Sequence, residues 1–286
     1  MNWQGAGYLL LTSFLWGTNW PVMKFLFSEL PPFSARTTSC LFCIAVMLGV
    51  AVARREKLMP PKGQWRRLLT SAGLNFGAWM TFTAVGLAWL RASETAIVAY
   101  TLPVWTVILA RPLLGERLTA SRGLGLILGL AGVSMLVVTE SPAVAWTKLP
   151  GVVFTLMGAL LFALGAVLSK RAPLNMPPFA AVGWQTAIGV LPLLAGMLVE
   201  QPDFRAVDAL GGLAFVSSGA LANGLGYITW FAALRRLPAS LVGIGSLLVP
   251  IIGVLASAVM LGEPLGWREG GALALALSGV AIASRR

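Results

Sequence analysis

A proline-interrupted apolar stretch occurs twice in this chain, and its two copies limit the folds that the chain can adopt. The first copy covers residues 95–119, with Pro103 near its middle, and the second covers residues 241–266, with Pro250. The prolines are 147 positions apart (250 − 103), and the same offset superimposes further identical pairs: Leu114 on Leu261, Gly115 on Gly262, Glu116 on Glu263 and Leu118 on Leu265. One gapless offset across several apolar segments indicates an internal duplication.

The composition places this duplication in a membrane. Of the 286 residues, 57% are hydrophobic and only 11% are charged, and the mean hydropathy is +0.82. Soluble domains carry roughly 25% charged residues, and one membrane span needs about 20 apolar residues. We therefore expect an all-α polytopic membrane protein with ten transmembrane helices, near residues 5–27, 33–53, 68–89, 95–114, 122–138, 150–169, 179–199, 209–234, 239–261 and 266–284.

The distribution of basic residues predicts the orientation of these helices. With both termini in the cytoplasm, 15 of the 21 lysines and arginines fall on the cytoplasmic side, as membrane insertion favours. The duplication divides the chain into a first five-helix repeat (1–138), a connecting loop (139–149) and a second repeat (150–286). Since five is odd, the two repeats insert in opposite orientations, which predicts an inverted repeat. Such proteins are typically transporters that bind substrate near the midplane between the repeats.

Several other classes of function are disfavoured. The chain has no histidine, which removes histidine-based catalytic triads and most zinc sites, so we expect no metal and no cofactor. Cys40 and Cys43 have C-x-x-C spacing but lie in an apolar span, where packing explains them better than redox chemistry. The net charge of +11 is carried by short inter-helix loops, which indicates membrane topology rather than a nucleic-acid partner.

Polar and aromatic residues at helical spacing predict a central cavity. Polar groups are costly at membrane depth, so those present are expected to face protein or water. The candidate substrate-binding residues are Trp16, Asn19 and Trp20 on the first helix, Asn75, Trp79 and Phe82 on the third, Tyr100 on the fourth, Asn223, Tyr227 and Trp230 on the eighth, and Ser246 on the ninth. Ordinary helix packing and interfacial tryptophan belts are the alternative. We expect this cavity to lack buried charge, which suits neutral zwitterions or flat amphipathic molecules.

The repeated proline predicts a hinge in each half. Pro103 and Pro250 each remove a backbone donor, and Gly243 and Gly245 loosen the second copy further. A static kink with repaired backbone bonds is the alternative. Glu116 and Glu263 lie at the ends of spans, so solvated or capping roles are favoured over proton coupling. No aspartate or glutamate falls at the centre of any predicted span.

With these residues in place, the chain resembles the drug/metabolite transporter superfamily, in its ten-helix EamA-like branch. The resemblance is carried by Gly-Glu before the last helix of each half, by Leu15-Trp16-Gly17-Thr18-Asn19 with Lys24, by Arg36, and more weakly by Phe162-Ala163-Leu164-Gly165 with Lys170. Its aromatic-rich character is similar to that of the YddG-type aromatic amino-acid exporters. The resemblance implies a multi-pass exporter of a bacterial-type inner (plasma) membrane.

We therefore expect a secondary transporter, not an enzyme. It would export small metabolites, above all amino acids including aromatic ones, by alternating access around the central cavity. An exporter of drugs or other amphipathic metabolites, with or without proton coupling, stays open as the alternative, and a membrane-embedded enzyme is a remote one. The expected partners are a small-molecule substrate and the lipid bilayer, and the choice between monomer and homodimer stays open.

Overall fold

The computed structural model of the chain describes residues 3–115, 119–137 and 142–283, and within these residues it contains helices and no strand. The first half forms α1 (Trp3–Glu29), α2 (Pro32–Ala53), α3 (Trp65–Ser71), the π-helix η1 (Ala72–Ala78), α4 (Trp79–Trp89), α5 (Ala92–Ala99), α6 (Leu102–Leu114) and α7 (Ala120–Val137). The second half forms α8 (Pro142–Arg171), α9 (Pro178–Gly189), α10 (Leu191–Glu200), the 3₁₀ turn η2 (Phe204–Ala206), α11 (Ala209–Ser217), the π-helix η3 (Ser218–Leu225), α12 (Gly226–Arg236), α13 (Ala239–Gly245), α14 (Leu248–Leu261) and α15 (Trp267–Ala283).

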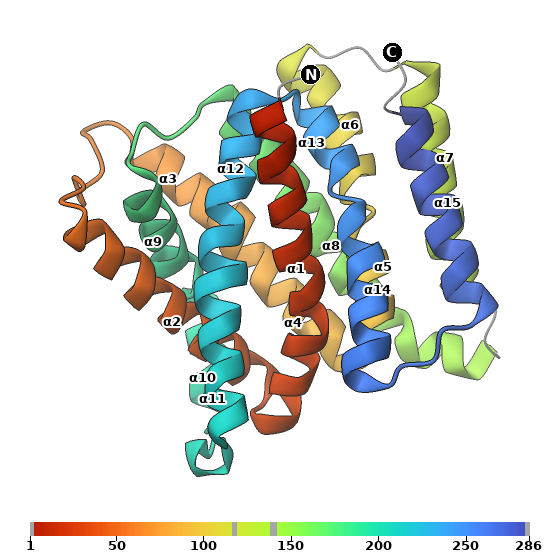
Figure 1. Ribbon diagram of the computed structural model, residues 1–286, viewed down its shortest axis with the longest axis horizontal. Coiled ribbons are helices and arrows are strands. Elements are labelled where there is room, and N and C mark those ends of the chain that lie inside the picture. Colours follow the sequence, from red (N-terminus) through yellow and green to blue (C-terminus); the bar gives the residue numbers. More distant parts are fainter. Residues whose placement is uncertain (1–2, 116–118, 138–141, 284–286) are drawn as a thin grey trace.

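The two ends of the described chain lie on the same side of the molecule. Figure 1 shows that α1 begins and α15 ends there, and we name it the terminal side and its opposite the far side. Four helical stretches of the described residues are long and apolar enough to cross a membrane: 32–53, 146–171, 209–236 and 241–261. The pair α9 and α10, bent by 45°, makes a fifth if it counts as one span. An all-helical membrane protein is thus supported, and the count of ten spans stays a prediction.

The start of α8 differs from the sequence-based expectation. Residues 142–149, assigned above to the connecting loop 139–149, are helical and form the first turns of α8. Pro142 is the first residue of α8. An amide at this position would make no hydrogen bond within the helix, so the missing amide hydrogen of proline costs no bond there. The helix also continues through Pro150, where the apolar pattern predicted that it would begin. The division of the chain into two five-helix repeats stays a prediction.

Both proline-containing segments are broken helices. The break falls at Tyr100–Thr101 between α5 and α6, and at Ser246–Leu247 between α13 and α14. Pro103 and Pro250 lie in the first turn of the helix after each break, where proline fits best. The second helix of each pair ends at a left-handed glycine, with φ +71° at Gly115 and +65° at Gly262. Glycine adopts this conformation at no steric cost, which explains the paired Gly-Glu turns.

The π-helices η1 and η3 were not predicted from the sequence. They cover Ala72–Ala78 and Ser218–Leu225, so their last residues are 147 positions apart, the offset of the duplication. A π-helix is rare because its i→i+5 hydrogen bonds are poorly packed, and it is frequent at functional sites. Here η1 runs into α4 and η3 into α12, the two segments that carry most of the predicted aromatic residues.

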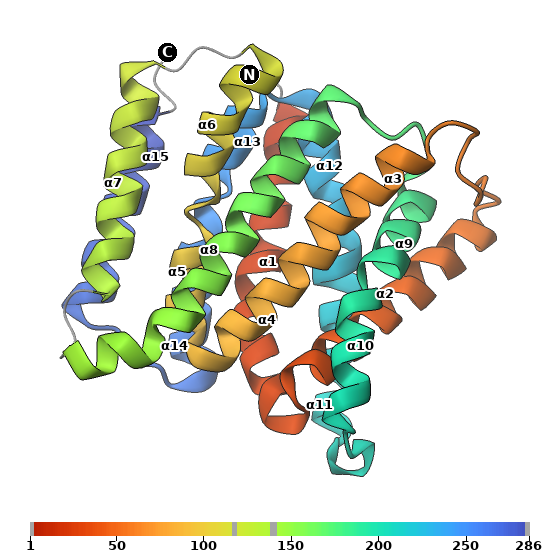
Figure 2. The ribbon, with the colours of Figure 1, turned by 180° about the vertical axis from the view of Figure 1, so that it is seen from behind.

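The helices α7 and α15 lie together at one edge of the molecule, beside the rest of the bundle (Figures 1 and 2). Their backbones approach closely at glycines. A β-carbon built on Gly279 would lie 2.7 Å from the Gly125 carbonyl oxygen, and one on Gly132 would lie 3.0 Å from that of Ala272. Small residues allow such close helix packing in membranes. These glycines therefore serve a contact within the chain.

Candidate functional site

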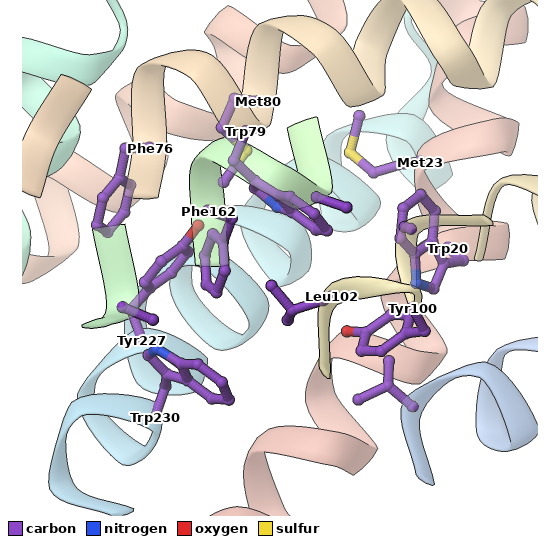
Figure 3. Packing of buried hydrophobic residues seen from close by; sticks show 14 of the residues in the cluster. Trp20, Met23, Phe76, Trp79, Met80, Tyr100, Leu102, Phe162, Tyr227 and Trp230 are labelled. Atoms are coloured by element: carbon purple, nitrogen blue, oxygen red, sulfur yellow. The ribbon is translucent and has the colours of Figure 1, made fainter. Parts of the chain in front are cut away.

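An aromatic cluster built from both halves of the chain occupies the centre of the bundle (Figure 3). Trp16 of α1 lies at its middle, with ring centroids 5.2 Å from Tyr227, 5.2 Å from Trp230 and 5.8 Å from Phe162. Phe76 stacks on Tyr227 at 3.8 Å, and Trp79 lies 4.9 Å from Phe162. Rings from α1, η1, α4, α8 and α12 thus converge, as pairs of aromatic side chains favour.

Two hydrogen bonds fix the orientation of this cluster. The Trp16 indole nitrogen donates to the Ala222 carbonyl oxygen at 3.0 Å, and the Tyr227 hydroxyl donates to the Asn75 carbonyl oxygen at 2.7 Å. Both acceptors lie in π-helices, Asn75 in η1 and Ala222 in η3. Each π-helix therefore supplies a carbonyl group to an aromatic side chain of the cluster.

A cavity of about 30 Å³ lies beside the cluster. Seven of the predicted substrate-binding residues line it: Trp16, Asn19, Trp20, Trp79, Tyr100, Asn223 and Tyr227. Met80 and Arg36 complete the lining. A single water needs about 10–15 Å³, so this space holds water but no metabolite. A substrate enters only if the surrounding side chains separate.

The other four candidates lie outside this cavity. The Asn75 side chain donates to Ser71 at 3.0 Å and to Ser169 at 3.2 Å, away from Trp79. Phe82 stacks on Phe154 at 5.9 Å. Trp230 packs against Trp16 within the cluster, and Ser246 donates to the Gly243 carbonyl oxygen at 2.6 Å.

The expectation of a cavity without buried charge is wrong, because Arg36 lines it. Arg36 lies one turn into α2 and is only 4% exposed. The sequence pattern named Arg36 only as part of the family resemblance. In the structure α2 begins at Pro32, and its buried face, which includes Arg36, packs against other helices, among them η3, where Gly219 lies close to Ser39. This geometry turns the guanidinium group inward.

A larger vestibule of about 700 Å³ lies on the terminal side, between α1, α3, α8, α9 and α12. Its volume falls within the range of small-molecule sites. Six basic residues line it: Arg66, Arg67, Lys170, Arg171, Arg235 and Arg236. No aspartate or glutamate of the described residues lines it, so the entrance is strongly electropositive.

A polar network separates the vestibule from the central cavity. Ser71, Ser169 and Gln185 line the vestibule, and the Ser71 hydroxyl hydrogen-bonds to the Gln185 side-chain oxygen and to Ser169 at 3.3 Å. The Asn75 amide joins both serines, and its backbone carbonyl accepts from Tyr227, which lines the cavity. A few polar groups of α3, η1, α8, α9 and α12 therefore form the partition between the two spaces.

The far side is closed by an ionic cluster. Arg91 pairs with Glu94 at 2.9 Å and with Glu269 at 3.1 Å, and Lys148 pairs with Glu94 at 2.8 Å. Glu263 accepts hydrogen bonds from the amides of Ala92 at 3.1 Å and Ser93 at 3.2 Å, which caps the start of α5. Burial alone would raise the pKa of the Glu94 carboxyl, but the hydrogen bonds from Lys148 and Arg91 outweigh it and hold that pKa below its ordinary value.

The four predicted hinge residues lie where the broken helices meet their neighbours. A β-carbon on Gly243 would lie 3.5 Å from the Pro103 Cα atom, so the two breaks approach each other. One on Gly245 would lie 2.3 Å from a Leu9 methyl carbon, so this glycine allows α1 to pack closely. Glu116, discussed above as a capping residue, lies outside the described residues.

Sequence reasoning missed three residues of this site. Phe162 contacts Trp16, Trp79, Tyr227 and Trp230, yet no asparagine accompanies it at helical spacing, as one does in the three predicted stripes. Met80 follows Trp79 directly, on what the stripe analysis took as another face. Arg36 had a signal, since it is a charge four residues inside an apolar span.

A bundle of apolar and broken helices around a central cavity, closed on one side and hollowed on the other, defines a polytopic membrane transporter. The comparisons with known proteins give its family. A profile of the EamA-like transporter family matches residues 3–138 and 149–285, and the chain belongs to this family.

Several relatives agree with this assignment, and a solved structure shares the fold. The chain is 31% identical over 264 residues to the "Uncharacterized transporter YvbV" of Bacillus subtilis (strain 168), covering 90% of this chain and 84% of the relative. It is 27% identical to a "Probable amino-acid metabolite efflux pump" of Salmonella typhimurium (96% and 93% covered), and 25% to a "Probable terminal-alkyne amino-acid exporter" of Streptantibioticus cattleyicolor (88% and 82%). One crystal structure shares the fold with a TM-score of 0.74 at 23% identity, covering 96% of both chains.

Proposed function

We propose that this transporter exports amino acids, including aromatic ones, across a bacterial-type inner membrane by alternating access. The observation that carries the proposal is the central cavity, at which Trp16, Trp20, Trp79, Tyr100 and Tyr227 present aromatic faces and Asn19 and Asn223 present amides. Aromatic rings stack on flat side chains and attract ammonium groups, and amides bond polar ends. Two relatives are named as amino-acid efflux proteins, which supports the same substrate class.

The proposed architecture is ten spans in two inverted five-helix repeats, with both termini cytoplasmic. A pair of lysines supports the inversion. Lys24 donates to the carbonyl oxygens of Leu87 and Leu90 at the end of α4, on the far side. Lys170 donates to those of Leu234 and Leu237 at the end of α12, on the terminal side. The capped leucines are 147 positions apart, so equivalent contacts face opposite sides.

The arrangement then fits an inward-facing conformation. The basic vestibule lies on the terminal side, which the excess of lysine and arginine assigns to the cytoplasm. The ionic cluster of Arg91, Glu94, Lys148 and Glu269 closes the far side. Export would break the partition first and the ionic cluster second, with Pro103, Pro250, Gly243 and Gly245 absorbing the change.

Facilitated export or exchange is the proposed mode of coupling. No aspartate or glutamate of the described residues lines the cavity or the vestibule. A proton-coupled exporter of drugs or other amphipathic metabolites is the second candidate, favoured by the apolar character of the cluster, but it needs a proton carrier elsewhere.

Transport by the purified protein in proteoliposomes tests the proposal. Labelled phenylalanine and threonine are followed with and without a pH gradient. We expect saturable movement of phenylalanine that the gradient does not alter. Replacing Trp79 or Tyr100 by alanine should reduce it strongly, whereas Trp146→Ala, at a side chain 72% exposed, should not. Absence of amino-acid movement would refute the substrate class, and strict dependence on the gradient would refute facilitated transport.

A further inference from the structure

Arg36 is a buried cation without an anion. Among the described residues, its only hydrogen bond runs from a terminal guanidinium nitrogen to the Met80 sulfur at 3.8 Å, a weak acceptor. Its Nε atom is buried, and in the part of the chain that the structure describes it has no hydrogen-bond partner and no carboxylate within ion-pair distance. The other inward-reaching cations of the bundle, Lys24 and Lys170, each bond two carbonyl oxygens at a helix end. Arg36 therefore stands apart from the cations that stabilise the fold.

An unpaired buried charge is costly enough to require an explanation. A charged side chain at membrane depth is normally paired, hydrated or functional, because a low-dielectric surrounding does not solvate it. A cavity beside an unpaired buried charge is the place where a neutralising partner can bind. The guanidinium of Arg36 lies on the wall of the central cavity, opposite aromatic faces and two asparagines.

We propose that Arg36 binds the carboxylate of the transported substrate in the central cavity. This inference rests on the proposed function and deepens it, because it names the group of the substrate that the site recognises. A guanidinium matches a carboxylate with two parallel hydrogen bonds, the strongest neutralising contact available to it. The buried Nε and a terminal nitrogen form the edge that such a contact uses.

The rest of the cavity fits the remainder of such a substrate. The amide oxygens of Asn19 and Asn223 and the hydroxyl oxygen of Tyr100 can accept hydrogen bonds from an ammonium group. The Asn223 amide nitrogen, a donor without a partner within the described residues, can donate to a carboxylate oxygen. Trp20 and Trp79, with centroids 6.4 Å apart at 73°, offer faces for an apolar side chain. Arg36 is the one cation among the described residues that line the cavity, so a monoanion is neutralised there and a phosphate dianion is not.

The positive charge of the vestibule also favours a substrate that carries a carboxylate. Its six basic residues raise the local concentration of anionic groups at the entrance. A substrate that exposes a carboxylate is drawn toward the partition and then meets a single buried arginine beyond it. Basic residues at the cytoplasmic ends of helices are expected from membrane topology alone. The proposal therefore rests on the buried charge of Arg36 and not on the basic residues of the vestibule.

Binding to the wild-type protein tests the inference without any substitution. Quenching of tryptophan fluorescence in detergent-solubilised full-length protein is measured with phenylalanine, 3-phenylpropanoate, phenylalaninamide, phenethylamine and phenyl phosphate. We expect phenylalanine and 3-phenylpropanoate to bind about 10- to 100-fold more tightly than the two compounds without a carboxylate, since bonds to a charged partner contribute on this scale. Equal affinity for phenylalaninamide and phenylalanine overturns the inference, and so does tighter binding of phenyl phosphate.

Two substitutions identify the residue that binds. Arg36→Gln should abolish the preference for carboxylates, and Arg36→Lys should retain part of it, because lysine keeps the charge but loses the forked geometry. The control is Arg205→Gln, which removes an equal charge from an exposed turn. A carboxylate preference that survives in a folded Arg36→Gln protein overturns the assignment.

The two proposals fail in different ways. Transport of phenylalanine and phenylalaninamide at equal rates removes the role of Arg36 and leaves amino-acid export standing. Tight binding of 3-phenylpropanoate without transport of any amino acid supports the carboxylate site and removes amino-acid export. Absence of binding by every carboxylate in the series overturns both.

Discussion

Removing one oxygen atom from the partition should measurably destabilise the protein. The change is Tyr227→Phe, which deletes the hydroxyl that donates to the Asn75 carbonyl oxygen at 2.7 Å. Tyr227 is 1% exposed and Asn75 is fully buried, so water cannot replace the lost bond. The stacking of the ring on Phe76 at 3.8 Å is retained, because phenylalanine keeps the ring.

The expected magnitude follows from this burial. A buried acceptor that loses its partner costs about 1–3 kcal/mol, whereas the average net contribution of a hydrogen bond is about 1 kcal/mol. The Asn75 carbonyl lies inside the π-helix η1 and can still accept from a backbone amide, so we expect the lower part of the range, about 1–2 kcal/mol. At roughly 2–4 °C per kcal/mol, the melting temperature should fall by about 2–8 °C.

Thermal unfolding followed by intrinsic tryptophan fluorescence measures this loss. Tyr100→Phe is the matched control, because Tyr100 is 4% exposed and lines the same cavity, but its hydroxyl makes no hydrogen bond within the described residues. We expect little change in its melting temperature. If both variants unfold at the wild-type temperature, or if Tyr100→Phe loses more than Tyr227→Phe, the bond to Asn75 does not hold the partition.

Three further substitutions test other parts of the fold. Lys24→Met should lower the melting temperature, because two carbonyl oxygens at the end of α4 lose their donor at about 1 kcal/mol or more, and exposed Lys62→Met should not. Gly279→Ala should destabilise by roughly 1–3 kcal/mol by forcing α15 from α7, whereas Gly270→Ala, with open space around it on the same helix, should be neutral or stabilising; equal effects would contradict the packing described. Glu94→Gln should lower the melting temperature at pH 7. Because the pKa of Glu94 is lowered in the folded protein, its contribution is present above the ordinary glutamate pKa of about 4.3 and is lost as the pH falls through the folded value; a difference from wild type that grows on acidification would show that the ion pairs do not stabilise.

The sequence predicted the helices because their signals are local. An apolar run of span length, a proline and a Gly-Glu turn each leave a mark that does not depend on the rest of the fold. The breaks before Pro103 and Pro250 and the left-handed turns at Gly115 and Gly262 are of this kind. The π-helices left no such mark, because the glycines around Asn75 and Asn223 are compatible with an ordinary α-helix.

Residues of the site were predicted correctly only where helical spacing along one element was enough to identify the face that lines the cavity. Trp16, Asn19 and Trp20 lie on one face of one helix, and that face lines the cavity. Trp79 reaches the cavity, but Asn75 does not, because the π-helix η1 rotates the segment before α4 by a fraction of a turn relative to the face assumed from α-helical spacing. Phe82 also lies outside the cavity and stacks on Phe154 of α8. The position of Arg36 at the cavity was not predicted, because the packing of α2 against other helices, and not local periodicity, places this side chain there.

The unequal strength of the two closures sets the order of events in transport. The cavity of about 30 Å³ admits no metabolite until one of its walls opens. On the terminal side, the partition is held by neutral hydrogen bonds around Asn75 and Tyr227 and borders the vestibule of about 700 Å³. On the far side, Glu94 accepts from two cations, and Arg91 also pairs with Glu269 across the helices of both halves. Because hydrogen bonds between neutral groups are weaker than those between charged groups, we expect the terminal partition to open first. The binding of a carboxylate to Arg36 then contributes the free energy that separation of the far side requires.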